Sequence, residues 1–132
     1  MTLMRYLGID YGSKRIGVAV SDDEGRMAFP AGVVSNRGKT VTKEIADRAR
    51  KEHINLIVIG MPMGLDGKET EQTHATRLFV VALKRAIKLP IETENEMLTS
   101  RMAEASGMKD EHIDAASAAI ILQSYLDRRN AL

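Results

Sequence analysis

The sequence predicts an α/β protein in which helices flank a five-stranded mixed sheet. Three observations predict this class: short β-branched runs open the chain, two segments with helical spacing follow, and a continuous apolar run lies between those two segments. The elements follow one another in the order βββαβαβα, with an additional helical segment before the last helix. The first, fourth and fifth strands are expected to be parallel, because helices provide the crossovers between them.

Three strands open the predicted fold. Residues 5–10 and 15–22 are short, apolar and β-branched, and a glycine-rich connection between them favours antiparallel pairing. Residues 26–34 form the third expected strand. Pro30 within it indicates an edge position or a bulge, because proline has no N–H group to donate to a neighbouring strand.

The middle of the chain alternates helices with strands. Residues 40–53 are expected to form an amphipathic helix, and residues 55–60 are an apolar run typical of a strand covered on both faces. After a loop, residues 69–88 have helical spacing, and Pro90 then favours an extended segment at 91–95. The apolar side predicted for this second helix consists of Ala75, Leu78, Phe79, Ala82, Leu83 and Ala86.

Two helices are expected at the end of the chain. Residues 96–106 have a helical pattern that stops near Gly107, and residues 111–128 form the last helix. Small residues surround Asp114 in this last helix, so it can approach the sheet closely. Its helical spacing is carried by Ile113, Ala116, Ile120 and Tyr125.

Size and composition narrow the classes of function. The 132 residues are expected to form one domain, residues 1–132, and 19 Lys and Arg against 18 Asp and Glu leave a net charge of +1. Any nucleic-acid partner must therefore be bound by a local basic patch. The chain has no cysteine, which excludes disulfides and thiolate metal sites, and we see no membrane-length apolar run or export signal. We expect a cytoplasmic protein with no membrane partner.

Three acidic residues form the candidate catalytic constellation. Asp10 ends the first strand, Glu96 follows the fifth, and Asp114 lies early in the last helix. Because substrates of such sheets bind at the carboxyl ends of parallel strands, we expect these carboxylates to converge there. Carboxylate ligands without cysteine suit Mg²⁺ or Mn²⁺, and two such ions about 4 Å apart would activate water and stabilise the leaving oxygen of a phosphodiester.

The distribution of charge is consistent with this chemistry. Residues 92–114 contain seven acids and two bases, whereas residues 37–53 contain six bases and three acids. Lys14 and Arg15 add two positive charges beside Asp10 and are the candidate contacts to phosphate. The two Phe and three Tyr residues are too few for a base-stacking platform, so recognition is expected to depend on backbone shape.

Five sequence motifs span nearly the whole chain. They are LGIDYGSKRIGVAVSD at 7–22, VIGMP at 58–62, ExLTS at 96–100, IDAA at 113–116 and LQSYL at 122–126. In this order they resemble the YqgF family, also called RuvX, of the RNase H-like nucleases. The resemblance implies an RNase H-like fold with strand order 3-2-1-4-5, and activity in maturing the 5′ end of pre-16S ribosomal RNA, with some relatives assigned to Holliday-junction resolution. Asp10, Glu96 and Asp114 match the acidic motif positions of the family.

The chain departs from the family pattern at two places. The family usually has Asp-Glu-Arg before Leu-Thr, whereas this chain has Asn95-Glu96-Met97 and so lacks one acid and one base. The family's Asn in the loop after the fourth strand is Gly64 here. The first departure implies a different rate or metal affinity, and the second a loss of side-chain contacts from that loop.

Several residues also have purely structural interpretations. Asp10 could form a turn, and Glu96 and Asp114 could be favoured by the dipole of a helix N-terminus. Asp66 follows the fourth strand and is a rival catalytic acid, but Asp66-Gly67 is more typical of a turn. The basic run at 37–53 is better explained as the solvated side of a helix.

Other functions fit the sequence less well. A phosphate-binding P-loop ending at Gly38-Lys39-Thr40 would need four residues between its glycines, but five lie between Gly32 and Gly38. An actin-like sugar kinase needs a second lobe that this length excludes. A non-catalytic RNA-binding module is favoured by Asn95 and Met97 but disfavoured by the retained acids, which repel a phosphate backbone.

We therefore predict a metal-dependent endonuclease that acts on structured ribosomal RNA, with branched DNA as the alternative substrate. The catalytic and metal-binding residues would be Asp10, Glu96 and Asp114, with Lys14 and Arg15 bound to phosphate. Resolution of a four-way junction needs paired active sites, so the DNA alternative predicts a homodimer.

Overall fold

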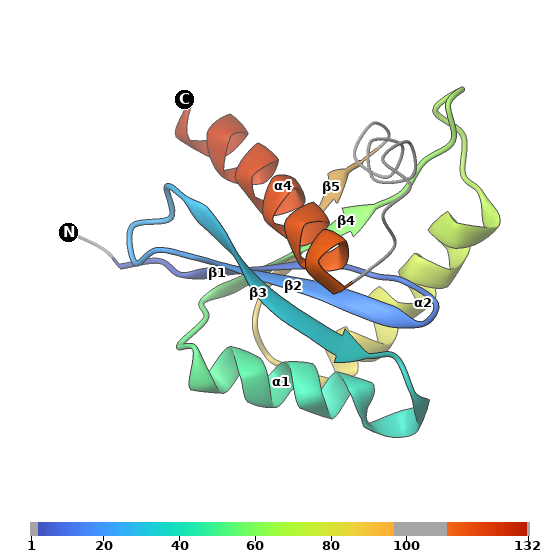
Figure 1. Ribbon diagram of the computed structural model, residues 1–132, viewed down its shortest axis with the longest axis horizontal. Coiled ribbons are helices and arrows are strands. Elements are labelled where there is room, and N and C mark those ends of the chain that lie inside the picture. Colours follow the sequence, from blue (N-terminus) through green and yellow to red (C-terminus); the bar gives the residue numbers. More distant parts are fainter. Residues whose placement is uncertain (1–2, 97–110, 132) are drawn as a thin grey trace.

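The computed structural model describes residues 3–96 and 111–131, which form a mixed sheet with helices on both faces (Figure 1). The sheet has five strands in the order β3-β2-β1-β4-β5, which confirms the predicted order. Most of the predicted helix at 96–106 lies outside the described residues. In chain order the elements are β1 (Tyr6–Asp10), β2 (Arg15–Ser21), β3 (Ala28–Ser35), a 3₁₀ turn (Gly38–Thr40), α1 (Val41–Lys51), β4 (Leu56–Met61), α2 (Glu71–Ala86), β5 (Ile91–Asn95) and α4 (Glu111–Asn130).

The strand directions also agree with the sequence. β4 is parallel to both β1 and β5, and β2 is antiparallel to β1 and β3. Ile9 is paired with Ile59, and Gly60 with Glu94, so β1, β4 and β5 end at one edge of the sheet. β3 is an edge strand, and its register with β2 shifts beside Pro30, as the proline indicated.

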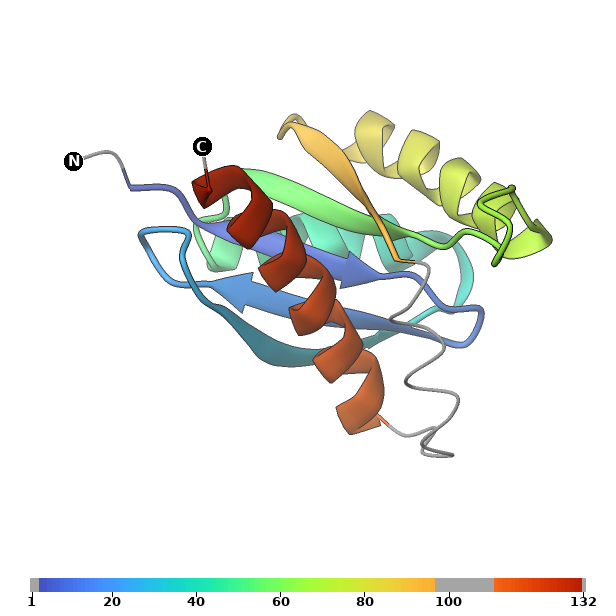
Figure 2. The same ribbon diagram turned by 90° about the horizontal axis from the view of Figure 1, so that it is seen from above.

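The helices divide between the two faces of the sheet. α1 and α2 cover one face and α4 crosses the other (Figure 2). β4 is buried throughout, as its apolar run predicted, and it contributes alternate side chains to the two cores. The core under α1 and α2 includes Leu7, Ile9, Ile57, Ile59 and Leu83. The core under α4 includes Tyr6, Val58, Ile121, Leu122 and Leu126. No helix within the described ranges is long and apolar enough to span a membrane.

Glycines in the sheet allow α4 to lie very close to it. A Cβ atom added to Gly8 would lie 2.7 Å from the Cβ of Leu122, and one added to Gly17 would overlap the carbonyl group of Asp114. The helix meets the sheet with Ala115 and Ala118, which are both buried, whereas Ala116 and Ile120 of the predicted spacing are exposed. Because Gly8 and Gly17 have no side chain, and Ala115 and Ala118 have only a methyl group, the backbone of α4 lies close to β1 and β2.

The buried face of α2 differs from the prediction. Phe79 and Leu83 are buried as expected, but Ala75, Leu78, Ala82 and Ala86 are exposed. Their places in the core are taken by Thr73, Thr76 and Val80. The two threonines can be buried because their hydroxyl groups donate to the carbonyl oxygens of Pro62 and Gln72. The spacing of apolar residues alone does not show that these threonines are buried.

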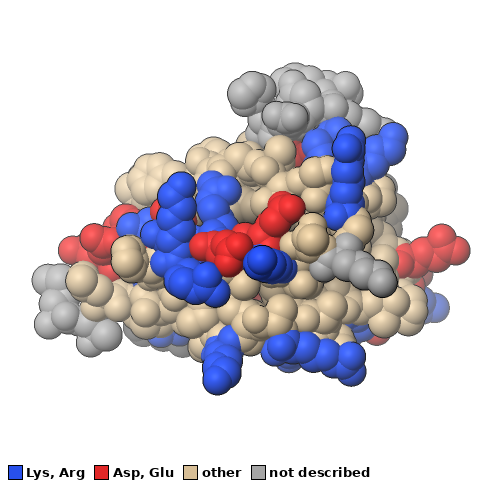
Figure 3. Space-filling view, turned by 90° about the horizontal axis from the view of Figure 1, so that it is seen from below, with Lys and Arg blue, Asp and Glu red and all other residues tan. Residues whose placement is uncertain are grey.

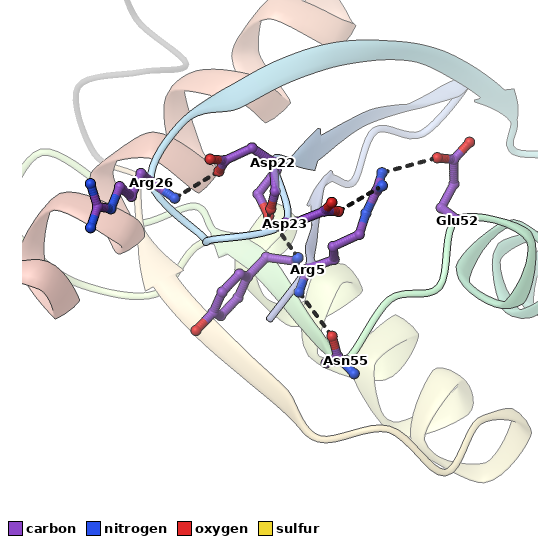
Figure 4. Close-up of polar contacts among 8 residues, drawn as sticks. Arg5, Asp22, Asp23, Arg26, Glu52 and Asn55 are labelled. Carbon is purple, nitrogen blue, oxygen red and sulfur yellow. Dashed lines mark hydrogen bonds and ion pairs between the residues drawn. The ribbon is translucent and has the colours of Figure 1, made fainter. Parts of the chain in front are cut away.

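Arg5 connects three segments at the end of the sheet opposite to Asp10 (Figure 4). Its backbone N–H donates to the Asn55 side chain at 2.9 Å, and its guanidinium lies 3.3 Å from carboxylate oxygens of both Asp23 and Glu52. The start of β1 is thereby joined to the β2–β3 turn and to the end of α1.

The Arg5→Ala variant is expected to lower the free energy of unfolding by about 1 kcal/mol, because two partly exposed ion pairs are lost. Urea denaturation measures the change, which should shrink when the salt concentration is raised. Arg26→Ala is the control, since the Arg26–Glu24 pair is largely exposed and should contribute almost nothing. Equal effects of the two substitutions would show that Arg5 does not connect these segments.

Candidate functional site

Acidic side chains gather at the edge of the sheet where β1, β4 and β5 end. Asp10 is the last residue of β1, and Glu96 directly follows β5. Strand alternation places Asp10, Gly60 and Glu96 on the face that α4 covers. Asp114 lies in the first turns of α4 itself. The structure thus brings the three predicted acids from distant parts of the chain to one edge of one face.

Glu96 is the most unusual of these residues. It is 3% exposed, and neither carboxylate oxygen has a hydrogen-bond partner among the described residues. Burial, with a further contribution from the charge of Asp10, raises the pKa of Glu96 to about 8. Gly60 makes room for it, because a Cβ atom there would lie 2.9 Å from Glu96 Oε2. A buried carboxylate without partners is costly unless it serves a ligand.

The preceding acids of β5 show that this isolation is specific to Glu96. Glu92 and Glu94 point to the same face of the strand, and both are held by α4. Tyr125 donates to Glu92, while Ser124 and Arg128 donate to Glu94. Of the three glutamates in this row, Glu96 alone lacks such partners among the described residues.

Asp10 interacts electrostatically with both of the other acids. The pKa of Asp10 is raised to about 7, mainly by burial and secondly by repulsion from Asp114. The charge of Asp10 in turn acts on Glu96. Mutual repulsion among desolvated carboxylates is the situation that a divalent cation relieves.

Asp114 forms an ion pair with a basic side chain of the protein, Arg15. Arg15 Nε lies 2.8 Å from Asp114 Oδ2, and both side chains are about one-third exposed. Within residues 3–96 and 111–131, no three acidic or histidine side chains lie close enough to form a ready metal site. The acids therefore reach one edge of the sheet without forming a closed three-ligand cluster. Their oxygens, above all the two of Glu96 that lack partners among the described residues, fit Mg²⁺ or Mn²⁺ as ligands.

A basic groove lies beside the acidic residues. It has a volume of about 470 Å³ and lies between the β1–β2 turn and the end of β3. Lys14 and Arg15, the candidate contacts to phosphate, line it, and Arg37 adds a third basic side chain. Arg37 was not singled out from the sequence, because its run of bases was interpreted as the solvated side of a helix.

Two other bases of that run, Arg48 and Arg50, have partners within the protein. Arg48 donates to the carbonyl of Ala31, and Arg50 pairs with Asp47 at 3.0 Å. On the face that α1 covers, acidic side chains lie among the basic ones (Figure 3). This face is therefore not a continuous basic surface.

The rival acid Asp66 has a structural role. It is exposed, and its Oδ1 accepts the backbone N–H of Lys68 at 2.9 Å within the turn that follows β4. The alternative interpretation of Asp66 as a turn residue is confirmed. Asn95 is exposed at the end of β5, while Met97 lies outside the described residues.

The raised pKa values predict that the metal-free protein loses stability as pH rises from about 5 to 8. The folded state keeps protons on Asp10 and Glu96 that the unfolded state has already released, so the free energy of unfolding falls across this range. Urea denaturation in EDTA at several pH values measures the fall. Asp10→Asn should show a smaller fall, and an identical pH profile for the variant and the unchanged protein would contradict the assignment.

Comparisons with known proteins agree on one family. Residues 4–128 match a family model described as "RuvX: Holliday junction resolvase". A protein of Sulfurihydrogenibium sp. (strain YO3AOP1), named "Putative pre-16S rRNA nuclease", is 44% identical, covering 96% of this chain and 92% of the relative. One of the same name from Anaeromyxobacter sp. (strain Fw109-5) is 37% identical over 97% of this chain and all of the relative.

Solved structures give the fold. The structure titled "T. thermophilus RuvC in complex with Holliday junction substrate" superposes with a TM-score of 0.63, at 15% identity, and covers 96% of each chain. At this identity the likeness concerns the fold alone, and it confirms the predicted RNase H-like architecture.

Proposed function

The chain belongs to the RuvX family, and on this premise we propose that it is a metal-dependent endonuclease of structured RNA, acting at the 5′ end of pre-16S ribosomal RNA. The single observation that carries the proposal is the buried Glu96 carboxylate, which has no partner among the described residues and lies beside Asp10. Such a pair has no evident value for folding, whereas it suits a cation that works on phosphate.

The residues of the site have separate roles in this proposal. Asp10, Glu96 and Asp114 would hold two Mg²⁺ or Mn²⁺ ions. When bound, such ions lower the pKa of water and neutralise charge on a phosphodiester. Asp10 and Glu96 must give up their protons to act as ligands, so their raised pKa values make occupancy of the site pH-dependent. Lys14 and Arg15 would orient the strand through its phosphates.

Branched DNA is the second candidate substrate. It is favoured by the description of the matching family model as a Holliday junction resolvase. That activity requires two sites in a homodimer, because two of the four strands of a junction must be cut. The curated relatives named for pre-16S rRNA cover nearly the whole chain, and we therefore place RNA first.

The test compares cleavage of a structured RNA containing the 5′ end of pre-16S rRNA with cleavage of a four-way DNA junction. Each is incubated with Mg²⁺, Mn²⁺ or EDTA, and the oligomeric state is measured at the working concentration. The proposal is supported if the RNA is cleaved with Mg²⁺ or Mn²⁺ and EDTA abolishes this cleavage. Binding of either substrate without cleavage under any condition would instead identify a non-catalytic module.

A further inference from the structure

Arg15 takes part in two neighbouring features of the surface. It pairs with Asp114 at 2.8 Å, and it also lines the groove between the β1–β2 turn and the end of β3. Both side chains of the ion pair are about one-third exposed, so the pair can exchange partners without unfolding of the core. Arg15 therefore lies between the acidic residues and the groove.

The groove has the chemistry of a phosphodiester-binding site. Of the described residues that line it, Lys14, Arg15 and Arg37 are basic and none is acidic. Ser13, Ser35 and Asn36 add hydroxyl and amide groups that can donate to phosphate oxygens.

The two walls of the groove are joined to each other. The Asn36 side chain donates to the carbonyl of Gly12 at 2.7 Å, and the Asn36 backbone N–H donates to the carbonyl of Lys14 at 2.9 Å. The β1–β2 turn and the end of β3 are thus held together, so the groove is largely formed before a strand enters it.

On its other side, Arg15 competes with any cation for Asp114. The guanidinium already neutralises this carboxylate, and a divalent ion using the same oxygen must displace it. A phosphate in the groove offers Arg15 another anionic partner, one whose oxygens can accept two hydrogen bonds from a guanidinium. When the divalent ion displaces Arg15 from Asp114, the Arg15 side chain can bind this phosphate.

We propose that Arg15 is a transferable counter-ion, which pairs with Asp114 in the protein alone and passes to a phosphate of a nucleic-acid strand lying in the groove. Binding of the strand and binding of the divalent ion then favour each other, and by linkage this coupling is reciprocal. The inference rests on the proposed function, because it requires Asp114 to be a cation ligand.

The test is calorimetric titration of the full chain with Mn²⁺ in the absence of nucleic acid. Arg15→Gln removes the competing charge and is expected to bind Mn²⁺ at least about 5-fold more tightly. Lys14→Gln is the matched control, because it removes an adjacent charge in the same groove, and its Mn²⁺ affinity should stay within about 2-fold of the unchanged protein. Arg15→Lys keeps the charge and should bind Mn²⁺ more weakly than Arg15→Gln.

A second measurement uses fluorescence anisotropy with a single-stranded RNA oligonucleotide in EDTA. Arg15→Gln and Lys14→Gln should each bind more weakly, with the salt slope reduced by about one. Asp114→Asn breaks the ion pair from the other side and should bind RNA more tightly, whereas Asp66→Asn, in the turn after β4, should not. These variants test the exchange even if Arg15→Gln is poorly folded.

The outcomes separate this inference from the proposed function. Equal Mn²⁺ affinities of Arg15→Gln and Lys14→Gln, with Mn²⁺ bound by both, would overturn the inference and leave the nuclease proposal standing. If the Mn²⁺ and RNA affinities are as expected but no substrate is cleaved, the exchange of Arg15 between its partners is supported and the nuclease proposal is wrong. If neither the unchanged protein nor any variant binds Mn²⁺, both proposals fail.

Discussion

The Asp10→Asn variant is expected to lose more than about 100-fold in RNA cleavage, while the metal-free protein becomes more stable at pH 8. The loss should exceed the 10- to 100-fold effect typical of residues that only support a metal ligand, because Asp10 would be a ligand itself. The gain in stability follows from the same carboxylate, which burial and Asp114 disfavour in its ionised form. An amide of nearly the same shape removes that repulsion, and it also removes the effect of Asp10 on Glu96.

The opposite signs of the two effects make this prediction specific. A residue needed for folding would lose activity and stability together, whereas a residue kept for chemistry should lose activity and gain stability. Cleavage rates at saturating Mg²⁺ and urea denaturation in EDTA, both at pH 8, give the two values. Asp66→Asn is the control, because this exposed acid serves a turn and should leave the cleavage rate unchanged. A stable Asp10→Asn protein that still cleaves at the original rate would remove Asp10 from the site.

The fold was predictable where one physical constraint dominates. β4 is buried on both faces, so its sequence is a continuous apolar run that fits few alternatives. Pro30 could indicate an edge strand because a missing N–H group is incompatible with a central one. On α2 two constraints compete: the threonines are polar by composition, yet they are buried because nearby carbonyls accept their hydroxyl groups. Periodicity alone does not contain that information.

The candidate site was predictable as a set of residues but not as an arrangement. Asp10 and Glu96 could be placed at one edge, because strand ends of a parallel sheet meet there. The ion pair of Arg15 with Asp114 joins residues far apart in the chain, and no local pattern encodes it. Gly60 could be placed at this edge as well, but its role of making room for a neighbouring group was not predicted, although a glycine inside a strongly apolar strand indicates a close approach. Here that group is the carboxylate of Glu96.

Gly17→Ala is expected to lower the free energy of unfolding by about 3 kcal/mol and to abolish most of the cleavage activity. The added methyl group would overlap the carbonyl carbon and oxygen of Asp114 and lie 3.2 Å from the backbone nitrogen of Ala115. These are backbone atoms of α4, so no side-chain rotation can relieve the overlap and the helix itself must move away from β2. That movement separates Asp114 from Asp10 and opens the core that Ala118 and Leu122 close.

Gly32→Ala isolates this packing effect from the general cost of replacing a glycine. Gly32 has a φ of +92° and nothing within 4 Å of an added Cβ atom, so its replacement should cost only the roughly 1 kcal/mol of backbone strain. Urea denaturation compares the two variants, and cleavage and Mn²⁺ binding report whether Asp114 has moved. If Gly17→Ala is as stable as Gly32→Ala and binds Mn²⁺ normally, the helix can shift at little cost. Asp114 would then owe its position to its ion pair with Arg15, and not to the close contact between α4 and the glycines of the sheet.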